Sequence, residues 1–240
     1  MNLQRALQIV YPNVCISCDA QMDQPQALCS TCWGNTGFIA GLICDTCGVP
    51  LPGESDSGIV YCDDCLKLAR PWAQGRAALV YSGNAKRLVL ALKHGDRADL
   101  AKPASIWMAR AAGSMLGANT TLVPIPIHWR RMIKRRYNQA ALLAQGVARN
   151  CDINLEPRAL VRVRPTAVHE KMGVDARFAN MAGAIAPNGR QGQKLEGRNV
   201  VLVDDVMTSG ATLAAASEAC NAAGASQVSV LVLARVAKDA

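Results

Sequence analysis

The chain has 240 residues, of which 50% are hydrophobic, 4% aromatic and 18% charged, and its formal net charge is +8. It contains no run of about 18 apolar residues that could cross a membrane, and its first residues lack the charged and apolar regions of a secretory signal. These features exclude an integral membrane protein and predict a cytoplasmic protein without membrane insertion.

Composition and charge both change near residue 72. Eight of the ten cysteines lie between Cys15 and Cys65. Residues 1–72 hold three basic and seven acidic side chains, a net charge of −4, whereas residues 73–240 hold 23 and 11, a net charge of +12. We therefore expect two domains, a double zinc-binding module over 1–72 and a larger domain over 73–240 whose positive charge attracts phosphates.

The first domain contains four C-x-x-C knuckles. Each knuckle brings two thiolates to one ion, so eight cysteines predict two closed tetrahedral sites, with zinc as the structural metal. The knuckles are Cys15/Cys18, Cys29/Cys32, Cys44/Cys47 and Cys62/Cys65. Consecutive pairing, as in two tandem ribbons, is the simplest assignment, because ten residues separate the first two knuckles and fourteen the last two. Interleaved pairing is the alternative, whereas free thiols or redox pairs do not explain four repeats.

Few large aliphatic residues and many glycines and prolines occur in this first domain. A conventional apolar core is therefore not expected, and metal binding should supply much of the folding free energy. We expect a chelator to unfold residues 1–72 while leaving the second domain largely folded.

From about residue 77 onward, short apolar runs alternate with amphipathic segments. This alternation predicts an α/β fold with a mostly parallel sheet and flanking helices. The expected strands are Ala77–Tyr81, Thr121–Ile125, Ala159–Val163, Asn199–Val203 and Gln227–Leu233. The last two strands flank an alanine-rich helix that ends near Gly224, which predicts a βαβ crossover with its first loop at the carboxyl end of a strand.

Two adjacent carboxylates, Asp204 and Asp205, follow the strand expected at Asn199–Val203. Paired carboxylates at a strand end require hydroxyls, cations or water, and a ribose offers two hydroxyls. The next residues, from Thr208 to Thr212, combine hydroxyls and small side chains at a helix N-terminus, which favours a phosphate. The segment predicts a sugar-phosphate site; the alternative is a solvated strand end before an ordinary helix start.

A basic run precedes another expected helix start. Five cations fall within seven residues: Arg130, Arg131, Lys134, Arg135 and Arg136. Three interpretations compete, namely a phosphate-contacting part of the site, a nucleic-acid patch whose affinity falls with salt, and a solvated helix face. The first is preferred because the Pro124–Pro126 segment is nearby in the chain. His169 and Lys93 are weaker candidates, for proton exchange and for a phosphate contact.

The segment from Val200 to Thr212, VVLVDDVMTSGAT, matches the phosphoribosyl pyrophosphate signature of type I phosphoribosyltransferases, and the whole chain resembles the ComF branch of that family. Further matches are the cysteine-rich amino terminus, residues 92–96 (LKHGD), 123–126 (VPIP) and 135–139 (RRYNQ), Arg164-x-Thr166, and Arg177-x-x-Asn180. Two departures occur, since the family usually has RGFNQ in place of RRYNQ and glutamine in place of His169.

The resemblance implies roles for individual residues. Asp204 and Asp205 would hold the ribose of 5-phosphoribosyl-1-pyrophosphate, which binds with Mg²⁺. The loop around its phosphate would consist of Val206, Met207, Thr208, Ser209, Gly210, Ala211 and Thr212. Pro124, Ile125 and Pro126 would contact the pyrophosphate. Residues 164–180 would form a mobile loop over the site, on which Arg164 and Arg177, together with Arg136 of the basic run, would face the charge of the leaving group.

Two functions fit the sequence. The first is a Mg²⁺-dependent phosphoribosyltransferase of unknown acceptor, which the family resemblance links to DNA uptake and natural competence, with single-stranded DNA and competence-machinery proteins as partners. The second is a non-enzymatic adaptor that binds DNA or protein and retains the fold and the ligand site. The fold alone does not separate them.

Overall fold

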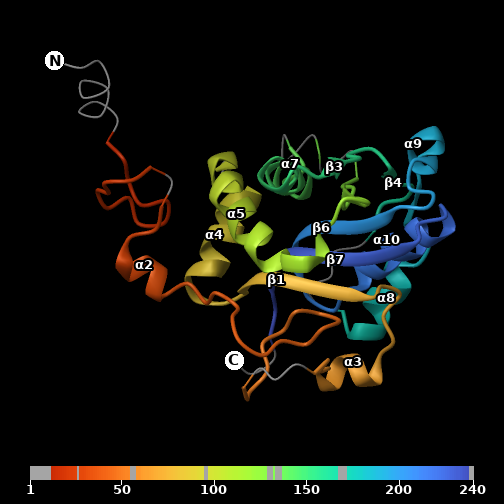
Figure 1. Ribbon diagram of the computed structural model, residues 1–240, viewed down its shortest axis with the longest axis horizontal. Coiled ribbons are helices and arrows are strands. Elements are labelled where there is room, and N and C mark those ends of the chain that lie inside the picture. Colours follow the sequence, from red (N-terminus) through yellow and green to blue (C-terminus); the bar gives the residue numbers. More distant parts are fainter. Residues whose placement is uncertain are drawn as a thin grey trace.

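The computed structural model describes residues 12–25, 27–54, 58–94, 97–128, 132, 137–166 and 172–237. Its centre is a five-stranded sheet in the order β1-β7-β6-β2-β3, in which all neighbours are parallel (Figure 1). The strands are β1 (Gln74–Val80), β2 (Thr120–Pro124), β3 (Asn154–Leu155), β6 (Asn199–Met207) and β7 (Gln227–Arg235). This parallel sheet with its flanking helices confirms the predicted α/β fold class.

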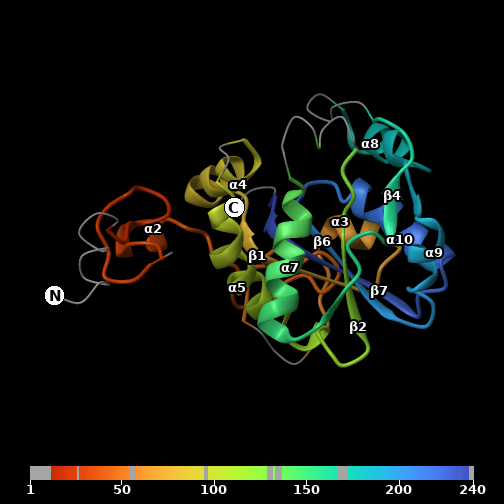
Figure 2. The same cartoon turned by 90° about the horizontal axis from the view of Figure 1, so that it is seen from above.

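Helices cover both faces of the sheet (Figure 2). On one face, α4 (Gly83–His94), α5 (Ala101–Ala112) and α7 (Gln139–Cys151) contact the strands. On the other face, α10 (Ala211–Ala222) packs against β6 and β7 and also contacts α8 (Val174–Met181). The shorter helices are α2 (Ser30–Gly34), η1 (Ala98–Leu100), η2 (Gly113–Met115), α3 (Asp63–Lys67) and α9 (Gly189–Gln193). Within the described ranges, no helix is long and apolar enough to cross a membrane.

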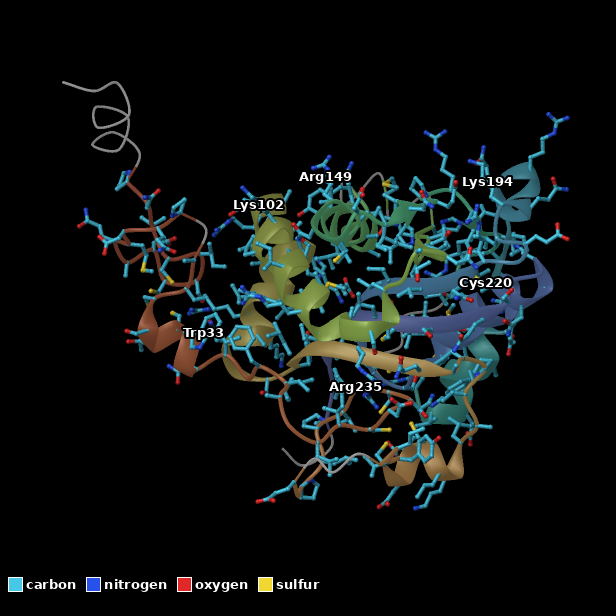
Figure 3. The ribbon with its side chains drawn as sticks, viewed as in Figure 1. Trp33, Lys102, Arg149, Lys194, Cys220 and Arg235 are labelled. Atoms are coloured by element: carbon cyan, nitrogen blue, oxygen red, sulfur yellow. The ribbon has the colours of Figure 1, made fainter. Side chains whose placement is uncertain are left out.

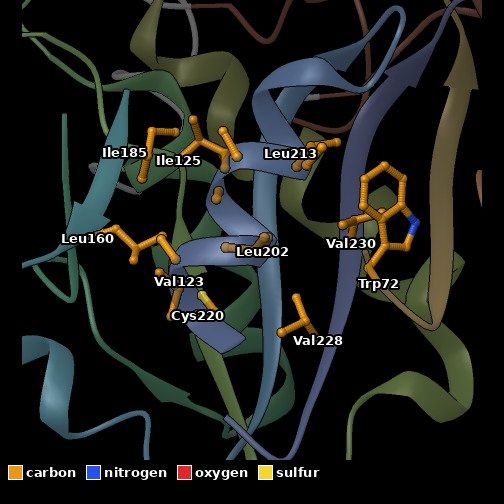
Figure 4. Packing of buried hydrophobic residues seen from close by; sticks show 14 of the residues in the cluster. Trp72, Val123, Ile125, Leu160, Ile185, Leu202, Leu213, Cys220, Val228 and Val230 are labelled. Atoms are coloured by element: carbon orange, nitrogen blue, oxygen red, sulfur yellow. The ribbon is translucent and has the colours of Figure 1, made fainter. Parts of the chain in front are cut away.

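The central strands are apolar on both sides because both faces of the sheet are covered. Val201 and Val203 of β6 belong to the cluster formed with α4, α5 and α7. Val200 and Leu202 belong to the cluster on the α10 side, part of which Figure 4 shows. Burying such a side chain stabilises the fold by roughly 1.5–3 kcal/mol. A strand buried on both faces therefore has a continuous apolar sequence, as NVVLV does.

Four of the five expected strands lie in the parallel sheet, and the fifth does not. β4 (Leu160–Arg162) pairs antiparallel with β5 (Ile185–Pro187) in a separate two-stranded sheet. The prediction of a parallel-sheet strand at Ala159–Val163 was wrong, because a short apolar run does not reveal which strand it will pair with. Strand β6, which precedes α10, is also longer than predicted, since it stays paired with β7 through Met207.

The segment between the second and third cysteine knuckles covers the edge strand β1. Phe38 forms an antiparallel bridge with Leu79, and the Ile39 amide donates to the Ala78 carbonyl at 3.0 Å. The first two knuckles, together with the residues that follow them, lie against α4, where Asn84 Nδ2 donates to Thr36 Oγ1 at 2.8 Å. The backbone contacts of Phe38 and Ile39 satisfy groups that the edge strand β1 would otherwise leave exposed.

The second cysteine module contacts β1 through the turn at Asp45 and Thr46. The Gly75 amide donates to the Asp45 carbonyl at 2.8 Å, and Trp72 Nε1 donates to the Thr46 carbonyl at 2.7 Å. Arg76 Nη2 forms an ion pair with Asp45 Oδ1 at 2.8 Å. The turn therefore lies directly against the backbone of β1.

Gly75 permits this close approach. A Cβ atom at residue 75 would lie 2.3 Å from the Thr46 carbonyl oxygen, so Gly75→Ala must push two backbones apart. We expect Gly75→Ala to lower the free energy of unfolding by about 1–3 kcal/mol in urea denaturation. Gly34→Ala is the matched control, because a Cβ atom there meets nothing within 4 Å. Equal stability of the two variants would contradict this account of the docking.

Candidate functional site

The carboxyl end of β6 presents two acidic side chains to different surroundings. Successive residues of a strand point to opposite faces. Asp205 is 8% exposed and lies on the α4 side, where Lys93 Nζ contacts its Oδ1 at 3.0 Å. Asp204 lies on the α10 side and accepts a hydrogen bond from the Asp205 amide on its Oδ1 at 2.9 Å. Lys93, expected only as a weak phosphate contact, thus forms an ion pair with one of the two carboxylates.

The electrostatics of this strand end favour a protonated Asp204. Burial raises the pKa of Asp204 and the neighbouring charge of Asp205 raises it further, while Lys93 and Arg162 act in the opposite direction, and the result is a pKa of about 7. Such a carboxyl group gains most from a ligand that brings hydroxyl donors or a cation, because either one stabilises the ionised form.

The loop from Thr208 to Gly210 turns the chain from β6 into α10. Gly210 stands at the helix start with a positive φ of 83°. A small cavity of about 30 Å³ lies here, lined by Asp204 and residues 206–213. The first amides of a helix lack intrahelical partners and carry the positive end of the helix dipole. The carboxyl group of Asp204 and the N-terminus of α10 therefore border one cavity.

The Pro124–Pro126 segment lies beside β6, as expected from the strand order. Pro124 is in register with Val203, and the Ile125 amide donates to the Val203 carbonyl at 2.9 Å. Asn138 Nδ2 fixes the segment further by donating to the Ile125 carbonyl at 3.0 Å. Proline has no amide hydrogen, and the amide of Ile125 is already used. These three residues can border a ligand without donating a backbone hydrogen bond to it.

Of the predicted arginines, the structure describes Arg164 and Arg177, and Arg177 lines a cavity together with Thr208 and Ser209 of the loop. Arg164 Nη2 donates to the carbonyls of Asn180 and Ala182, at 3.0 and 2.7 Å, and so holds the end of α8. Arg177 of α8 donates to the Met172 carbonyl at 3.0 Å. Outside the described residues lie Arg136 and the rest of the basic run (Arg130, Arg131, Lys134 and Arg135), together with His169 and Lys171 of the expected mobile loop.

The eight knuckle cysteines form two tetrads in consecutive order. The tetrads are Cys15, Cys18, Cys29 and Cys32, and Cys44, Cys47, Cys62 and Cys65, with the sulfur atoms of each within 4.8 Å of one another. Cys18 and Cys29 have their Sγ atoms 3.7 Å apart, and Cys47 and Cys62 do as well. A tetrahedron with Zn–S bonds of about 2.3 Å has edges of about 3.8 Å, so this spacing fits four-coordinate zinc. Both tetrads therefore have the geometry of structural zinc sites.

Arg235 connects the second tetrad with the loop at Thr208, and Arg70 bonds the same loop. Arg235, which is 4% exposed at the end of β7, donates from Nη1 to the carbonyls of Met207 (3.2 Å) and Thr208 (2.8 Å), and its Nη2 lies 3.9 Å from Cys47 Sγ. Arg70 Nη1 donates to the Ser209 carbonyl at 2.6 Å. The sequence analysis missed both residues, although a charge that ends the apolar run QVSVLVLAR is a signal for a buried, bonded arginine.

Comparison with known proteins finds two domain families in the chain. The double zinc ribbon domain family matches residues 6–66, and the phosphoribosyl transferase domain family matches residues 139–240. The chain is 28% identical over 215 residues to the DNA utilization protein YhgH of Escherichia coli K12, an alignment that covers 87% of this chain and 90% of the relative. It is 26% identical over 229 residues to competence protein F of Haemophilus influenzae, covering 86% and 96%. It is 25% identical over 223 residues to competence protein ComFC of Bacillus subtilis, covering 85% and 87%.

Proposed function

Since this chain joins a double zinc ribbon to a phosphoribosyltransferase domain, as ComF-type proteins do, we propose that it binds 5-phosphoribosyl-1-pyrophosphate with Mg²⁺ and transfers the phosphoribosyl group to an acceptor in the uptake or use of external DNA. The domains divide after residue 72 in this proposal. The observation that carries it is the placement of Asp204 beside the N-terminus of α10 on one small cavity.

Each end of the ligand has a matching group in this arrangement. The 5-phosphate binds the amides and hydroxyls of residues 208–212, where the helix dipole favours an anion. The ribose hydroxyls donate to the carboxylates of Asp204 and Asp205, and Lys93 holds Asp205 in place through their ion pair at 3.0 Å. The pyrophosphate extends past the Pro124–Pro126 segment, and Arg136 and Arg177 are assigned to its charge by the family resemblance alone.

The transfer step breaks one bond and forms one. The bond between C1 of the ribose and the pyrophosphate oxygen breaks, the electron pair leaves with pyrophosphate, and a nucleophilic atom of the acceptor bonds to C1. Bound Mg²⁺ supplies charge neutralisation for the departing pyrophosphate. The chain's own contribution is to fix the ribose and the phosphate so that C1 is held in line between acceptor and leaving group.

A calorimetric titration of the wild-type chain tests the binding step. We expect phosphoribosyl pyrophosphate to bind with a 1:1 stoichiometry in Mg²⁺ and more weakly in EDTA. Thr212→Val removes a hydroxyl at the first turn of α10 and is expected to weaken binding about tenfold or more, because hydrogen bonds to charged groups contribute about 1.5–3 kcal/mol. Lys194→Ala, on the solvated side of an ion pair with Glu156, serves as the control. No binding to wild-type protein in Mg²⁺ would refute the proposal.

The pKa of Asp204 makes this affinity depend on pH. With a pKa of about 7, only about one tenth of Asp204 is ionised at pH 6, so the affinity for the Mg²⁺ complex should rise about tenfold between pH 6 and pH 8. In the ligand-free chain the pH dependence of folding stability has the opposite sign. The folded state keeps a proton on Asp204 that the unfolded state loses above about pH 3.9. Asp204 therefore makes the free energy of unfolding fall as the pH rises toward 7. Asp204→Asn should remove the rise in affinity between pH 6 and pH 8 and leave only the effect of the ligand's own phosphates. Calorimetric titrations at a series of pH values measure this.

A second candidate, the non-enzymatic adaptor, is supported by the net charge of +12 on residues 73–240 and by relatives named for DNA utilization and competence. Electrostatic attraction of this kind would bind single-stranded DNA with an affinity that falls steeply with salt. Salt-sensitive DNA binding that survives the loss of both Asp204 and Asp205, in a chain that releases no pyrophosphate, would favour the adaptor.

A further inference from the structure

The last turn of α4 carries Lys93, and two side chains at the start of α7 hold the end of this turn. The last carbonyls of a helix have no intrahelical partner, so a last turn without other partners frays. Here Tyr137 Oη donates to the Leu92 carbonyl at 2.8 Å, and Gln139 Nε2 donates to the Lys93 carbonyl at 3.5 Å. Donors from another part of the chain therefore cap the end of α4.

Asn138, which lies between these two donors in the chain, holds the neighbouring part of the site. Its side chain caps the start of α7 and also donates to the Ile125 carbonyl at 3.0 Å. The Ile125 amide in turn donates at 2.9 Å to the carbonyl of Val203, the residue directly before Asp204. Residues 137–139 therefore support both the end of α4 and the strand end that carries the two carboxylates.

Gln139 is a buried polar residue in apolar surroundings. It is 1% exposed and is the first residue of α7, the helix whose last turn carries Arg149 (Figure 3). The apolar cluster on this side of the sheet includes Leu92 and Leu143. Burying a side-chain amide costs free energy that an apolar side chain of similar size would not cost. The amide at residue 139 therefore indicates a role beyond packing, and its bond to the end of α4 supplies one.

Lys93 connects this support with the carboxylate pair. Its Nζ lies 3.0 Å from Asp205 Oδ1, with the two side chains 20% and 11% exposed. A lysine side chain is long and flexible, so the place that its ammonium group reaches depends on how the backbone of residue 93 is held. The same ammonium group lowers the pKa of Asp204, which burial and the charge of Asp205 raise, and Arg162 is the second cation that lowers it. A displacement of Lys93 would therefore change the charge state of both carboxylates.

We propose that residues 137–139 are a positioning element for the carboxylate pair. Tyr137 and Gln139 fix the backbone at the end of α4 so that Lys93 stays paired with Asp205, and Asn138 fixes the strand end beside them. These residues act through Lys93 and do not contact the ligand. The inference rests on the proposed function in one respect, namely that the carboxylate pair receives the ribose.

A carboxyl-carbon NMR titration of the ligand-free, full-length chain tests this element, because it follows Asp204 directly. Lys93→Met removes the ammonium group, and Gln139→Leu removes the donor to residue 93. Both should move the titration of Asp204 above the wild-type pKa of about 7, since a charge that favours the ionised form is lost or displaced. The double variant should titrate like Lys93→Met alone, because two residues that act through one contact do not have additive effects.

Asn150→Leu is the matched control. It makes the same amide-to-leucine change at the other end of α7, where Asn150 Nδ2 donates to Ser105 Oγ at 3.3 Å. The titration of Asp204 should stay as in the wild type. Tyr137→Phe keeps the aromatic ring and removes one hydroxyl group, so it should give a smaller shift in the same direction as Gln139→Leu. If Gln139→Leu does not fold, Tyr137→Phe decides by the same measurement.

Binding measurements separate this inference from the proposed function. At pH 7, Gln139→Leu and Lys93→Met should each weaken binding of phosphoribosyl pyrophosphate and Mg²⁺ about tenfold, because hydrogen bonds to an ionised carboxylate are the strong ones. An unchanged titration of Asp204 in folded Gln139→Leu, or additive shifts in the double variant, would overturn the positioning element. Absence of ligand binding to the wild-type chain would overturn the proposed function, and the titration of Asp204 would still decide on the positioning element.

Discussion

Replacing both Asp204 and Asp205 with asparagine is expected to weaken binding of phosphoribosyl pyrophosphate and Mg²⁺ about 100-fold or more without unfolding the chain. In the proposed complex the two carboxylates accept from ribose hydroxyls, and hydrogen bonds to charged groups contribute about 1.5–3 kcal/mol each. Asparagine keeps the shape and one oxygen acceptor but loses the charge. The apo protein should remain folded, because the change also removes the mutual repulsion that raises the pKa of Asp204.

The measurement is titration calorimetry, with circular dichroism as the check on folding. Glu218→Gln is the matched control, since it removes one carboxylate from an exposed position of α10, the helix that follows the loop from Thr208 to Gly210. Its affinity should equal that of the wild type. A double variant that binds the ligand as tightly as the control would show that the carboxylates do not hold the ribose.

Loss of the second zinc site is expected to disturb the loop from Thr208 to Gly210 and weaken ligand binding there. Loss of the first zinc site is not. Cys47 is buried and its Sγ lies 3.9 Å from Arg235, whose Nη1 holds the carbonyls of Met207 and Thr208. Cys47→Ser should release one equivalent of zinc, unfold the second ribbon and lower ligand affinity about tenfold or more, because structural zinc supplies the folding energy of such modules. Cys18→Ser, at an exposed cysteine of the first tetrad, should release one equivalent of zinc and leave the affinity unchanged.

Metal analysis measures the zinc lost from each of the two variants, and calorimetry measures their affinity for the ligand. The expectation that a chelator unfolds residues 1–72 and leaves the second domain largely folded takes a more specific form here, because Cys44, Cys47 and Trp72 are buried in the same cluster as Leu202 and Leu213. Equal ligand affinity in Cys47→Ser and Cys18→Ser would contradict a link between the second ribbon and the loop.

The crossover from β6 to β7 was predictable because its signals are local. A continuous apolar run, an alanine-rich helix and Gly224 at the helix end define it without any long-range information. The consecutive order of the cysteine knuckles is of the same kind, since short separations favour pairing of neighbours. Predictions of this type depend on residues that are close in the chain.

Contacts between distant segments were not predictable in the same way. The ion pair between Lys93 and Asp205 joins residues more than a hundred positions apart, and so does the bond from Arg70 to the Ser209 carbonyl. The antiparallel pairing of β4 with β5 depends on strands of three residues, which are too short to show a period. Sequence analysis identified the loop, but only the fold shows that the second ribbon lies against it.

A crystal structure of the chain grown with phosphoribosyl pyrophosphate and Mg²⁺ tests the central claim most directly. The account predicts the 5-phosphate within hydrogen-bond distance of the amides of residues 209–212, with the ribose hydroxyls on the carboxylates of Asp204 and Asp205. Density for the ligand at another surface, or none at this loop when calorimetry shows saturation, would contradict it.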